Sequence, residues 1–376
     1  MNEKLATIAM LRTPRHKLWK IKLEEFKLLA KTQGYTIVNY IVQYKQKPKV
    51  ATLFGKGKLQ EIKEIIQDHA IDYLLVYNTL TSMQKLNLER ILRVNVLDRY
   101  DLVLEIFASN ASDSISKLQI ELAKLKKVIP YLKLQTSLLH YKDRPFFKAG
   151  GEYAWNPKLA ILRRRMKLIR KQIEKYREDK IKQILHRRSL GFIIVCLVGY
   201  YNAGKTSLFN LLTGENKSVS ASPFTTLSSK YSKFKNFNKI LLVDTIGFIS
   251  DLDPRIIASF ELNLEDIVYS DVLCLVIDSS DPVNILENKL NSTIQILRKI
   301  YAIRPEKKII TILNKIDLIK DPYELASRKQ IVQEILQNSL NISIDLLFLS
   351  SKTGDGISIL IDHLVRLVEN GGRGRI

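Results

Sequence analysis

The sequence has little cysteine and no long apolar run, and both absences exclude classes of protein. Cys196 and Cys274, the only two cysteines in 376 residues, stand inside the strand-like runs "FIIVCLVG" and "VLCLVID". A small buried hydrophobic residue explains both, so neither metal nor redox chemistry is indicated. No apolar run reaches the roughly 20 residues that a membrane span needs, and the first residues lack a signal-peptide pattern. We therefore expect a cytoplasmic protein without a membrane contact.

Acidic residues are scarce in only one half of the chain. Residues 1–190 contain 39 lysines and arginines against 18 aspartates and glutamates, a net charge of +21, whereas residues 191–376 contain 21 against 20. This division indicates one part that works on a small ligand and another that meets a polyanion. A cationic surface kept only for solubility is the alternative.

The first 112 residues alternate strand-like runs with helical patterns. "ATIAML", "YTIVNYIVQY" and "DYLLVYN" each precede an amphipathic stretch, and "VNVLD" closes the series. This alternation predicts a small parallel sheet covered by helices. The segment "FGKGKLQEI" places residues 55–58 at a strand-to-helix turn, where free backbone N–H groups can hold a phosphate. Its spacing is not that of a full nucleotide-binding loop, so an ordinary turn with surface lysines is the other interpretation.

From Ser114 the pattern changes to two long helices with apolar seams. Residues that step by three and four are Ile115, Leu118, Leu122, Leu125 and Ile129 in the first helix and Leu159, Leu162, Met166, Ile169, Ile173 and Tyr176 in the second. Two such seams predict an antiparallel helical hairpin, which we assign to residues 113–188.

The second arm of this hairpin, Pro157 to Arg188, is strongly cationic. It carries 13 basic and 3 acidic residues. A helix with so much charge of one sign repels itself unless phosphates lie nearby, so we expect it to contact RNA, although a solvated face explains part of the charge. The residues expected to make this contact are Arg163, Arg164, Arg165, Lys167, Arg170 and Lys171.

Between the two arms, residues 141–156 interleave aromatic and basic side chains in "YKDRPFFKAGGEYAWN". Aromatic rings that stack on bases, set among cations that meet phosphates, are typical of a contact with single-stranded or loop RNA. The same rings can instead pack the tip of the hairpin against another domain. The sequence leaves both interpretations open.

A phosphate-binding loop begins the last part of the chain. The apolar strand "FIIVCLVG" runs into Gly199-x-x-x-x-Gly204-Lys205-Thr206, which opens a helix. Backbone N–H groups of such a loop surround the β-phosphate, the lysine reaches the β- and γ-phosphates, and the Thr206 hydroxyl ligates Mg²⁺. The residues of this segment that we expect at the nucleotide are Tyr201, Asn202, Ala203, Gly204, Lys205, Thr206 and Ser207.

Two further motifs follow in the order that a guanine-nucleotide site requires. "KILLVDTIG" ends a strand in Asp244-x-x-Gly247, whose carboxylate holds Mg²⁺ through water and whose glycine amide meets the γ-phosphate. "KIITILNKID" ends another strand in Asn314-Lys315-x-Asp317. The aspartate accepts two hydrogen bonds from guanine, and adenine offers neither donor. The motifs therefore predict a Ras-like α/β domain that binds and hydrolyses GTP and releases GDP and phosphate.

Two loops complete the predicted site. "LFLSSKTGDGI" supplies Ser350, Ser351 and Lys352, which we expect near the guanine O6 and the ribose. "SASPFTTLSSKY" lies where the first switch belongs, and we expect Thr226, or else Thr225, to close over Mg²⁺ and the γ-phosphate. Thr226 is then a metal ligand and, with Lys205 and Gly247, one of the three residues expected to carry catalysis.

Phe248 follows Gly247, at the position where many GTPases have a glutamine that orients the attacking water. A phenyl ring neither donates nor accepts the hydrogen bond required. Phosphoryl transfer relies mainly on positioning and electrostatics, which the phosphate loop, Lys205 and Mg²⁺ supply. We therefore expect slow intrinsic hydrolysis, with the water placed by backbone groups near Thr226 and Gly247 and the site completed by a partner.

These motifs together resemble the HflX family, within the Obg and HflX group of translation-associated P-loop GTPases. "ATLFGKGKLQEI" is similar to the family's N-terminal domain, "SKLQIELAKLK" and "RRRMKLIRKQIEK" to its helical linker, and "GYYNAGKTSLFN" with "DTIGFISDLDPRIIASF" to its G domain. A hydrophobic residue in place of the glutamine is also similar to the family's pattern. The resemblance implies an N-terminal α/β domain over residues 1–112, the linker over 113–188, a G domain over 189–369 and a tail over 370–376.

The resemblance also implies the partners: the large ribosomal subunit and its rRNA, bound in a nucleotide-gated manner by a chain that we expect to be a monomer. The chain departs from the family's pattern at the linker tip, where only Gly150, Gly151 and Glu152 stand in place of a longer glycine-rich segment. We also expect the extra C-terminal domain of some relatives to be missing. The alternative function is an RNA-binding or remodelling module in which the nucleotide only sets the conformation.

Overall fold

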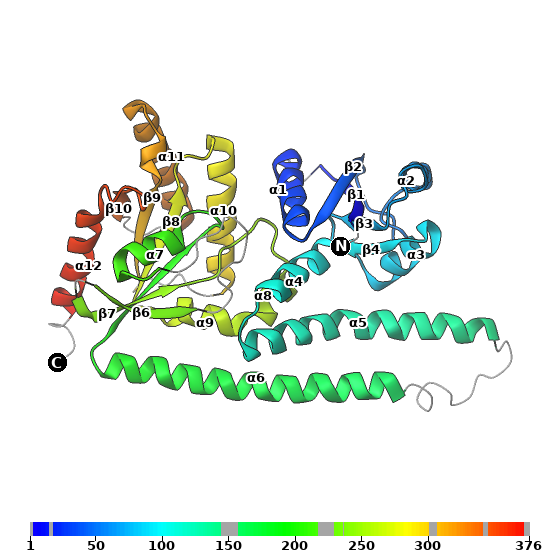
Figure 1. Ribbon diagram of the computed structural model, residues 1–376, viewed down its shortest axis with the longest axis horizontal. Helices are drawn as coiled ribbons and strands as arrows, with labels where there is room; N and C mark the ends of the chain where they lie inside the picture. Colours follow the sequence, from blue (N-terminus) through cyan, green and yellow to red (C-terminus); the bar gives the residue numbers. More distant parts are fainter. Residues whose placement is uncertain are drawn as a thin grey trace. The chain divides into compact units, whose positions relative to one another are not determined.

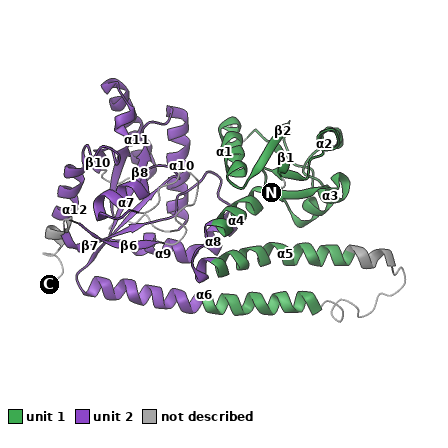
Figure 2. Cartoon of the chain, in the orientation of Figure 1, with its two compact units in different colours: residues 1–109, 117–173 green, residues 110–116, 174–376 purple. Residues whose placement is uncertain are grey.

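The computed structural model describes residues 3–14, 18–143, 157–216, 229–235, 237–300, 307–340 and 345–371. The chain divides into two compact units, the first made of residues 1–109 and 117–173 and the second of residues 110–116 and 174–376 (Figures 1 and 2). Each of the two longest helices contributes to both units.

The first unit contains a four-stranded parallel sheet with the strand order β2-β1-β3-β4. Its strands are β1 (Lys4–Arg12), β2 (Tyr35–Tyr44), β3 (Tyr73–Val76) and β4 (Asn95–Asp98). The helices that alternate with them are α1 (Trp19–Thr32), α2 (Lys56–Asp68) and α3 (Ser82–Leu92). The predicted parallel α/β arrangement of this part of the chain is therefore confirmed.

Helix α4 (Arg99–Asn110) follows β4 directly and was missing from the predicted series. Its buried residues include Leu102, Val103, Ile106 and Phe107. Apolar residues at successive positions hide the amphipathic period by which a surface helix is recognised. The pattern of this segment therefore gave no helical signal.

The two longest helices, α5 (Ser114–Asp143) and α6 (Pro157–Ser189), form the predicted hairpin. Within the first unit they share a core to which both arms contribute, made of Leu122, Leu125, Ile129, Leu159 and Ile169 with Leu118, Leu132, Leu162, Met166 and Ile173 packed against it. The predicted seams are thus confirmed from Leu118 to Ile129 and from Leu159 to Ile173, whereas Ile115 and Tyr176 are not part of this core and Tyr176 is half exposed. Residues 144–156 at the tip lie outside the described residues.

The second unit contains a six-stranded sheet with the order β10-β9-β8-β5-β7-β6, parallel except for the edge strand β6. Its strands are β5 (Ile193–Gly199), β6 (Lys230–Phe234), β7 (Phe237–Asp244), β8 (Val272–Asp278), β9 (Lys308–Asn314) and β10 (Asp345–Phe348). Its helices, besides the parts of α5 and α6, are α7 (Lys205–Thr213), α8 (Pro254–Ser259), α9 (Glu261–Tyr269), α10 (Val283–Lys299), α11 (Pro322–Leu340), α12 (Ile357–Gly371) and the short 3-10 helix η1 (Ile316–Leu318).

The core of the second unit lies between this sheet and its helices. Alternate residues of β5 and β7, such as Val195 and Leu242, pack with α7 and α12 in one cluster. The opposite alternation brings Cys196 of β5 to the backbone of α9. Both cysteines are fully buried, and burial raises the pKa of Cys274 to about 12, so this thiol stays protonated. Among the described residues, no helix has both the length and the apolar character to cross a bilayer.

Candidate nucleotide-binding site

The phosphate loop connects β5, which lies between β7 and β8, to the first residue of α7. Tyr201, Asn202, Ala203 and Gly204 lie in the loop, and Thr206 and Ser207 lie in the first turn of α7. Gly204 has a φ of +91°, and a Cβ atom there would lie 2.2 Å from the side-chain nitrogen of Asn314. Only glycine fits such a position, because the backbone is left-handed and its neighbour is in contact.

Lys205 is held by the loop itself. Its ammonium donates hydrogen bonds to the carbonyl oxygens of Gly199 (3.2 Å) and Tyr200 (2.8 Å), and the residue is buried. Burial lowers the pKa of Lys205 to about 8, although the Asp244 carboxylate acts in the opposite direction. Near neutral pH the loop therefore holds a buried cation on neutral carbonyls, which is the electrostatic setting that favours an anionic phosphate.

Thr206 and Asp244 lie together at the carboxyl end of the sheet. The Thr206 hydroxyl donates a 3.0 Å hydrogen bond to the Asp244 carboxylate, which is fully buried at the end of β7. A hydroxyl and a carboxylate are hard oxygen donors, and Mg²⁺ prefers such ligands. The two residues therefore fit the predicted metal site, whereas Thr226 and Thr225 lie outside the described residues.

Gly247 lies against the phosphate loop. A Cβ atom at this position would lie 2.9 Å from the Cα atom of Tyr201 and 3.2 Å from the Lys205 nitrogen. A side chain here would therefore collide with the loop backbone, which explains why the Asp-x-x-Gly turn ends in glycine. The fold brings Gly247 and Lys205 together, as the motifs predicted.

Phe248 is anchored by both its ring and its backbone. The residue is 1% exposed. Its N–H donates to the carbonyl oxygen of Gly199 (3.1 Å), and its own carbonyl accepts the N–H of Tyr201 (2.9 Å). A phenyl ring buried in this way is consistent with the expectation that backbone groups place the water.

Asn314 joins three motifs on the guanine side of the site. Its side-chain N–H donates to the carbonyl of Ala203 (2.9 Å), and its side-chain oxygen accepts the N–H of Ser351 (2.9 Å). The residue is fully buried at the end of β9. Its amide therefore fixes the distance between the phosphate loop and the segment that follows β10.

Asp317 is oriented by Ser350. The fully buried Ser350 donates its hydroxyl to the Asp317 carboxylate at 2.6 Å and accepts the N–H of Lys352 at 3.2 Å. One carboxylate oxygen is thus held by the protein. We infer that Ser350 orients the carboxylate that is predicted to read the guanine base.

Asp278 belongs to this site, although the motifs did not indicate it. It ends β8 directly beside Asn314 of β9, and its carboxylate contacts the Lys315 ammonium at 2.5 Å. Lys315 has a left-handed backbone with a φ of 64°. The signal that could have found Asp278 is its place at the carboxyl end of a buried strand, where ligand sites of parallel sheets gather.

The last half of helix α6 is part of the second unit and forms ion pairs with other elements of that unit. Lys180 donates to the fully buried Asp266 of α9 (2.6 Å) and to the carbonyl of Leu262 (2.9 Å). Tyr231 of β6 donates its hydroxyl to the same carboxylate, and burial together with Asp266 raises the pKa of this phenol, so it stays protonated. Arg188 pairs with Asp271 at 2.5 Å. A single carboxylate thus joins α6, β6 and α9.

A parallel sheet with a phosphate loop, an Asp-x-x-Gly turn and an Asn-Lys-x-Asp motif at neighbouring strand ends defines a P-loop GTPase. Residues 194–315 match the protein family described as "50S ribosome-binding GTPase", and residues 20–108 match the one described as "GTP-binding GTPase N-terminal".

Two curated relatives cover most of the chain. The GTPase HflX of Thermococcus kodakarensis is 35% identical over 366 residues, which is 97% of this chain and 81% of that protein. The GTPase HflX of Methanocaldococcus jannaschii is 35% identical over 348 residues, 91% of this chain and 83% of that protein. A solved structure of a complex of SsGBP with GDP is 30% identical to this chain, with a TM-score of 0.54. The match covers 98% of this chain and 99% of the chain in that structure. The chain belongs to the HflX family of GTPases.

Proposed function

We propose that this GTPase is a nucleotide-gated switch that acts on the large ribosomal subunit and contacts its rRNA through the basic first half of the chain. The matched family is described as ribosome-binding, and the net charge of +21 on residues 1–190 is complementary to RNA. GTP, GDP and Mg²⁺ are the small ligands of the proposed switch.

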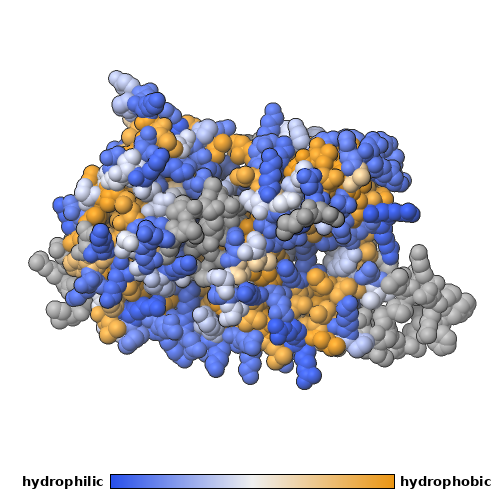
Figure 3. All heavy atoms as spheres, in the orientation of Figure 1, coloured by the Kyte–Doolittle hydropathy of each residue, from blue (hydrophilic) through white to orange (hydrophobic). Residues whose placement is uncertain are grey.

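The cationic face of α6 supplies the RNA contact in this proposal. Its six expected contact residues are all exposed. Figure 3 shows hydrophilic side chains, with hydrophobic ones among them, along the lower edge of the view, where Figure 1 draws α6. Arg165 differs from the others because the Glu121 carboxylate binds it at 2.7 and 2.8 Å. Arg163 and Arg164 are therefore the better candidates for phosphate contacts.

The observation that carries the proposal is the shared carboxylate of Asp266. Strand β6 begins just after the segment that contains Thr226, and α9 follows the Gly247 turn. A γ-phosphate that orders both segments would therefore act on the two elements to which Lys180 of α6 is tied. We infer that the nucleotide state reaches the basic arm by this route.

Hydrolysis in the proposed mechanism is slow without a partner. The loop amides and Lys205 would hold the phosphates, and Thr206, Thr226 and, through water, Asp244 would hold Mg²⁺, which would supply positive charge to offset that of the phosphates. Backbone groups near Gly247 and Thr226 place the water. A ribosomal contact then completes the site and raises the rate by about 10³ or more, the range in which partners act on related enzymes.

The test is GTP hydrolysis at fixed salt with and without large ribosomal subunits. We expect subunits to stimulate a slow basal rate, and the double variant Arg163→Glu, Arg164→Glu to lose the stimulation while it keeps the basal rate. The matched control is Glu178→Arg on the same helix, which adds a cation. A rate that subunits do not change would contradict the proposal.

The second candidate function, an RNA module whose conformation the nucleotide merely sets, is favoured by the charge of the arm alone. It predicts RNA binding with a steep salt dependence that is the same with GDP and with a non-hydrolysable GTP analogue. Equal salt slopes and equal affinities in both states would therefore select this function over the switch.

A further inference from the structure

The segment after Gly247 is joined to the phosphate loop by side chains whose residue types the motifs leave unspecified. Tyr200 is the second residue of the loop, and its hydroxyl lies 2.6 Å from the Ser250 hydroxyl and accepts the Ser250 N–H at 2.6 Å. The side-chain amide of Asn288 in α10 donates to the Ser250 hydroxyl at 3.1 Å. Tyr200 is 5% exposed and Ser250 is fully buried, so these hydrogen bonds are shielded from water.

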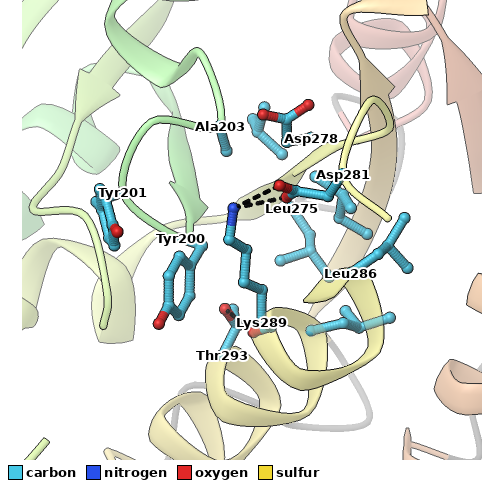
Figure 4. A pocket seen from close by; sticks show the side chains of 12 residues that line it. Tyr200, Tyr201, Ala203, Leu275, Asp278, Asp281, Leu286, Lys289 and Thr293 are labelled. Atoms are coloured by element: carbon cyan, nitrogen blue, oxygen red, sulfur yellow. Dashed lines mark hydrogen bonds and ion pairs between the residues drawn. The ribbon is translucent and has the colours of Figure 1, made fainter. Parts of the chain in front are cut away.

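The ring of Tyr200 is itself held in place. It lies beside α10, where the ammonium of Lys289 is 5.5 Å from the ring centroid and pairs with Asp281 at 2.6 Å (Figure 4). The cavity between these residues has a volume of only about 10 Å³, hardly space for one water. The ring therefore has little freedom to move, and its hydroxyl is a fixed point for Ser250.

Residues 248–250 are bonded to the phosphate loop at both ends, by the backbone of Phe248 and by the hydroxyl groups of Tyr200 and Ser250. Phe248 is bonded to Gly199 and Tyr201, while Ser250 is bonded to Tyr200 between them. The loop that surrounds the β-phosphate and the turn that meets the γ-phosphate are thus tied at two places. Such a tie fixes the Gly247–Phe248 peptide relative to the phosphates, which is what a backbone group needs if it is to orient water in place of a side chain.

We propose that Tyr200, Ser250 and Asn288 are positioning residues for GTP hydrolysis, which hold the Gly247–Phe248 peptide in the geometry that hydrolysis requires. The inference rests on the established GTPase activity and deepens the proposed placement of the water. It does not depend on the ribosome. None of the three side chains touches the phosphates in this role.

The first test uses Tyr200→Phe, which removes one hydroxyl and keeps the ring. Single-turnover hydrolysis without ribosomes, GDP affinity and the melting temperature are measured together. We expect the single-turnover rate constant to fall at least about five- to tenfold, the effect of losing one buried neutral hydrogen bond, with GDP affinity unchanged because GDP has no γ-phosphate. Ser250→Ala should do the same, and Ser250→Thr, which keeps a hydroxyl, should restore most of the rate.

The matched control is Tyr323→Phe, which removes a hydroxyl from a tyrosine that is 86% exposed. It should leave all three measurements unchanged. An unchanged rate constant in both Tyr200→Phe and Ser250→Ala would overturn the inference. So would a parallel loss of GDP affinity and of the rate constant, because that result describes a loosened loop and no specific effect on the γ-phosphate side.

Failure of this inference is distinguishable from failure of the proposed function. The variants are compared without ribosomes, whereas the proposed switch depends on the stimulation of the unaltered protein by large subunits. A double variant, Tyr200→Phe with Ser250→Ala, adds a further criterion. Its rate constant should fall by less than the product of the two single effects, because both variants remove the contact between the two hydroxyls. Independent multiplication of the two effects would contradict the shared role.

Discussion

The two parallel sheets of this protein end in carboxyl edges of similar architecture and different chemistry. In the first unit, side chains close the edge: Asn78 accepts the N–H of Leu11 (2.7 Å) and donates to its carbonyl (3.0 Å), and Asp98 accepts the N–H of Leu80 (2.8 Å). In the second unit, the corresponding edge carries the glycine-containing loop that opens α7. The first edge uses these backbone groups internally, whereas the loop at the second edge is predicted to offer backbone amides to the phosphates.

The lysines at the two edges differ in the same way. Lys127 contacts the carboxylates of Asp98 (2.6 Å) and Asp101 (2.9 Å), so its charge is compensated within the fold. Although burial acts against it, Lys127 and Lys85 hold the pKa of Asp101 below its usual value. Lys205, by contrast, is held by neutral carbonyls, and burial lowers its pKa. A cation paired with carboxylates stabilises a fold, whereas a cation held by neutral carbonyl groups is suited to bind phosphate.

The turn at residues 55–58 resembles the carboxyl edge of the first sheet, where side chains of the protein occupy the backbone groups. The N–H of Gly55 donates to the Gln43 side chain at 3.0 Å, and Gly55 has an ordinary extended backbone with a φ of −77°. The first amide of the turn is thereby occupied. This favours an ordinary turn with surface lysines over a phosphate site.

The largest effect that we predict is the loss of nucleotide binding in Lys205→Met. GTP affinity and hydrolysis should each fall about 10³-fold, because a buried phosphate contact is lost. Unfolding without nucleotide should show equal or higher stability at pH 7, since a desolvated charge is removed. Fluorescent-nucleotide titration and thermal unfolding check this, with Lys56→Met in the turn at residues 55–58 as the matched control that keeps full affinity.

The next largest effect concerns Asp317, the carboxylate that we expect to read the guanine base. Asp317→Asn should lower GTP affinity about 10²-fold or more, because an amide cannot accept both guanine donors. It should raise the affinity for xanthosine triphosphate, whose base offers an acceptor where guanine has the amine. Competition titrations with GTP, XTP and ATP measure both changes, and an unchanged preference for GTP would show that Asp317 does not read the base.

Lys127→Met should produce the opposite pattern to Lys205→Met. It leaves the fully buried Asp98 without its ammonium partner, which costs about 3 kcal/mol of the free energy of unfolding. GTP affinity should stay the same. Urea unfolding followed by tryptophan fluorescence reports this change, since both tryptophans lie in residues 1–190. Lys117→Met, an exposed position on the same helix, is the control.

The smallest effect is a pH dependence that we expect only at the phosphate loop of the second unit. The pKa of Lys205 is about 8 in the nucleotide-free protein, and bound phosphates raise it, so binding takes up a proton above pH 8. GDP affinity should therefore fall by up to about tenfold per pH unit between pH 8 and pH 9. Stability without nucleotide should rise over the same range, because the unfolded lysine stays protonated to higher pH. Lys205→Met should remove both trends.

The sequence by itself determined the class of protein and the chemistry of its ligand. The phosphate loop, Asp244-x-x-Gly247 and Asn314-Lys315-x-Asp317 are contiguous in the chain, and each needs particular residue types at fixed spacing. The apolar seams of the helical hairpin could also be predicted, because a period of 3.6 residues marks the buried face of a helix. Constraints of this kind depend only on residues close together in the chain, so the sequence alone is enough to recognise them.

Only the tertiary structure decided how these motifs support one another. Asp278 and Lys315 are 37 residues apart, and Tyr200 and Ser250 are 50 apart, with no spacing rule to connect them. Helix α4 was not predicted, because it is buried on nearly all sides and therefore lacks the alternation of apolar and polar residues that marks a surface helix. The paths of the strands and the packing of α10 bring these residues together, and contacts between distant segments depend on the whole fold, which no local pattern encodes.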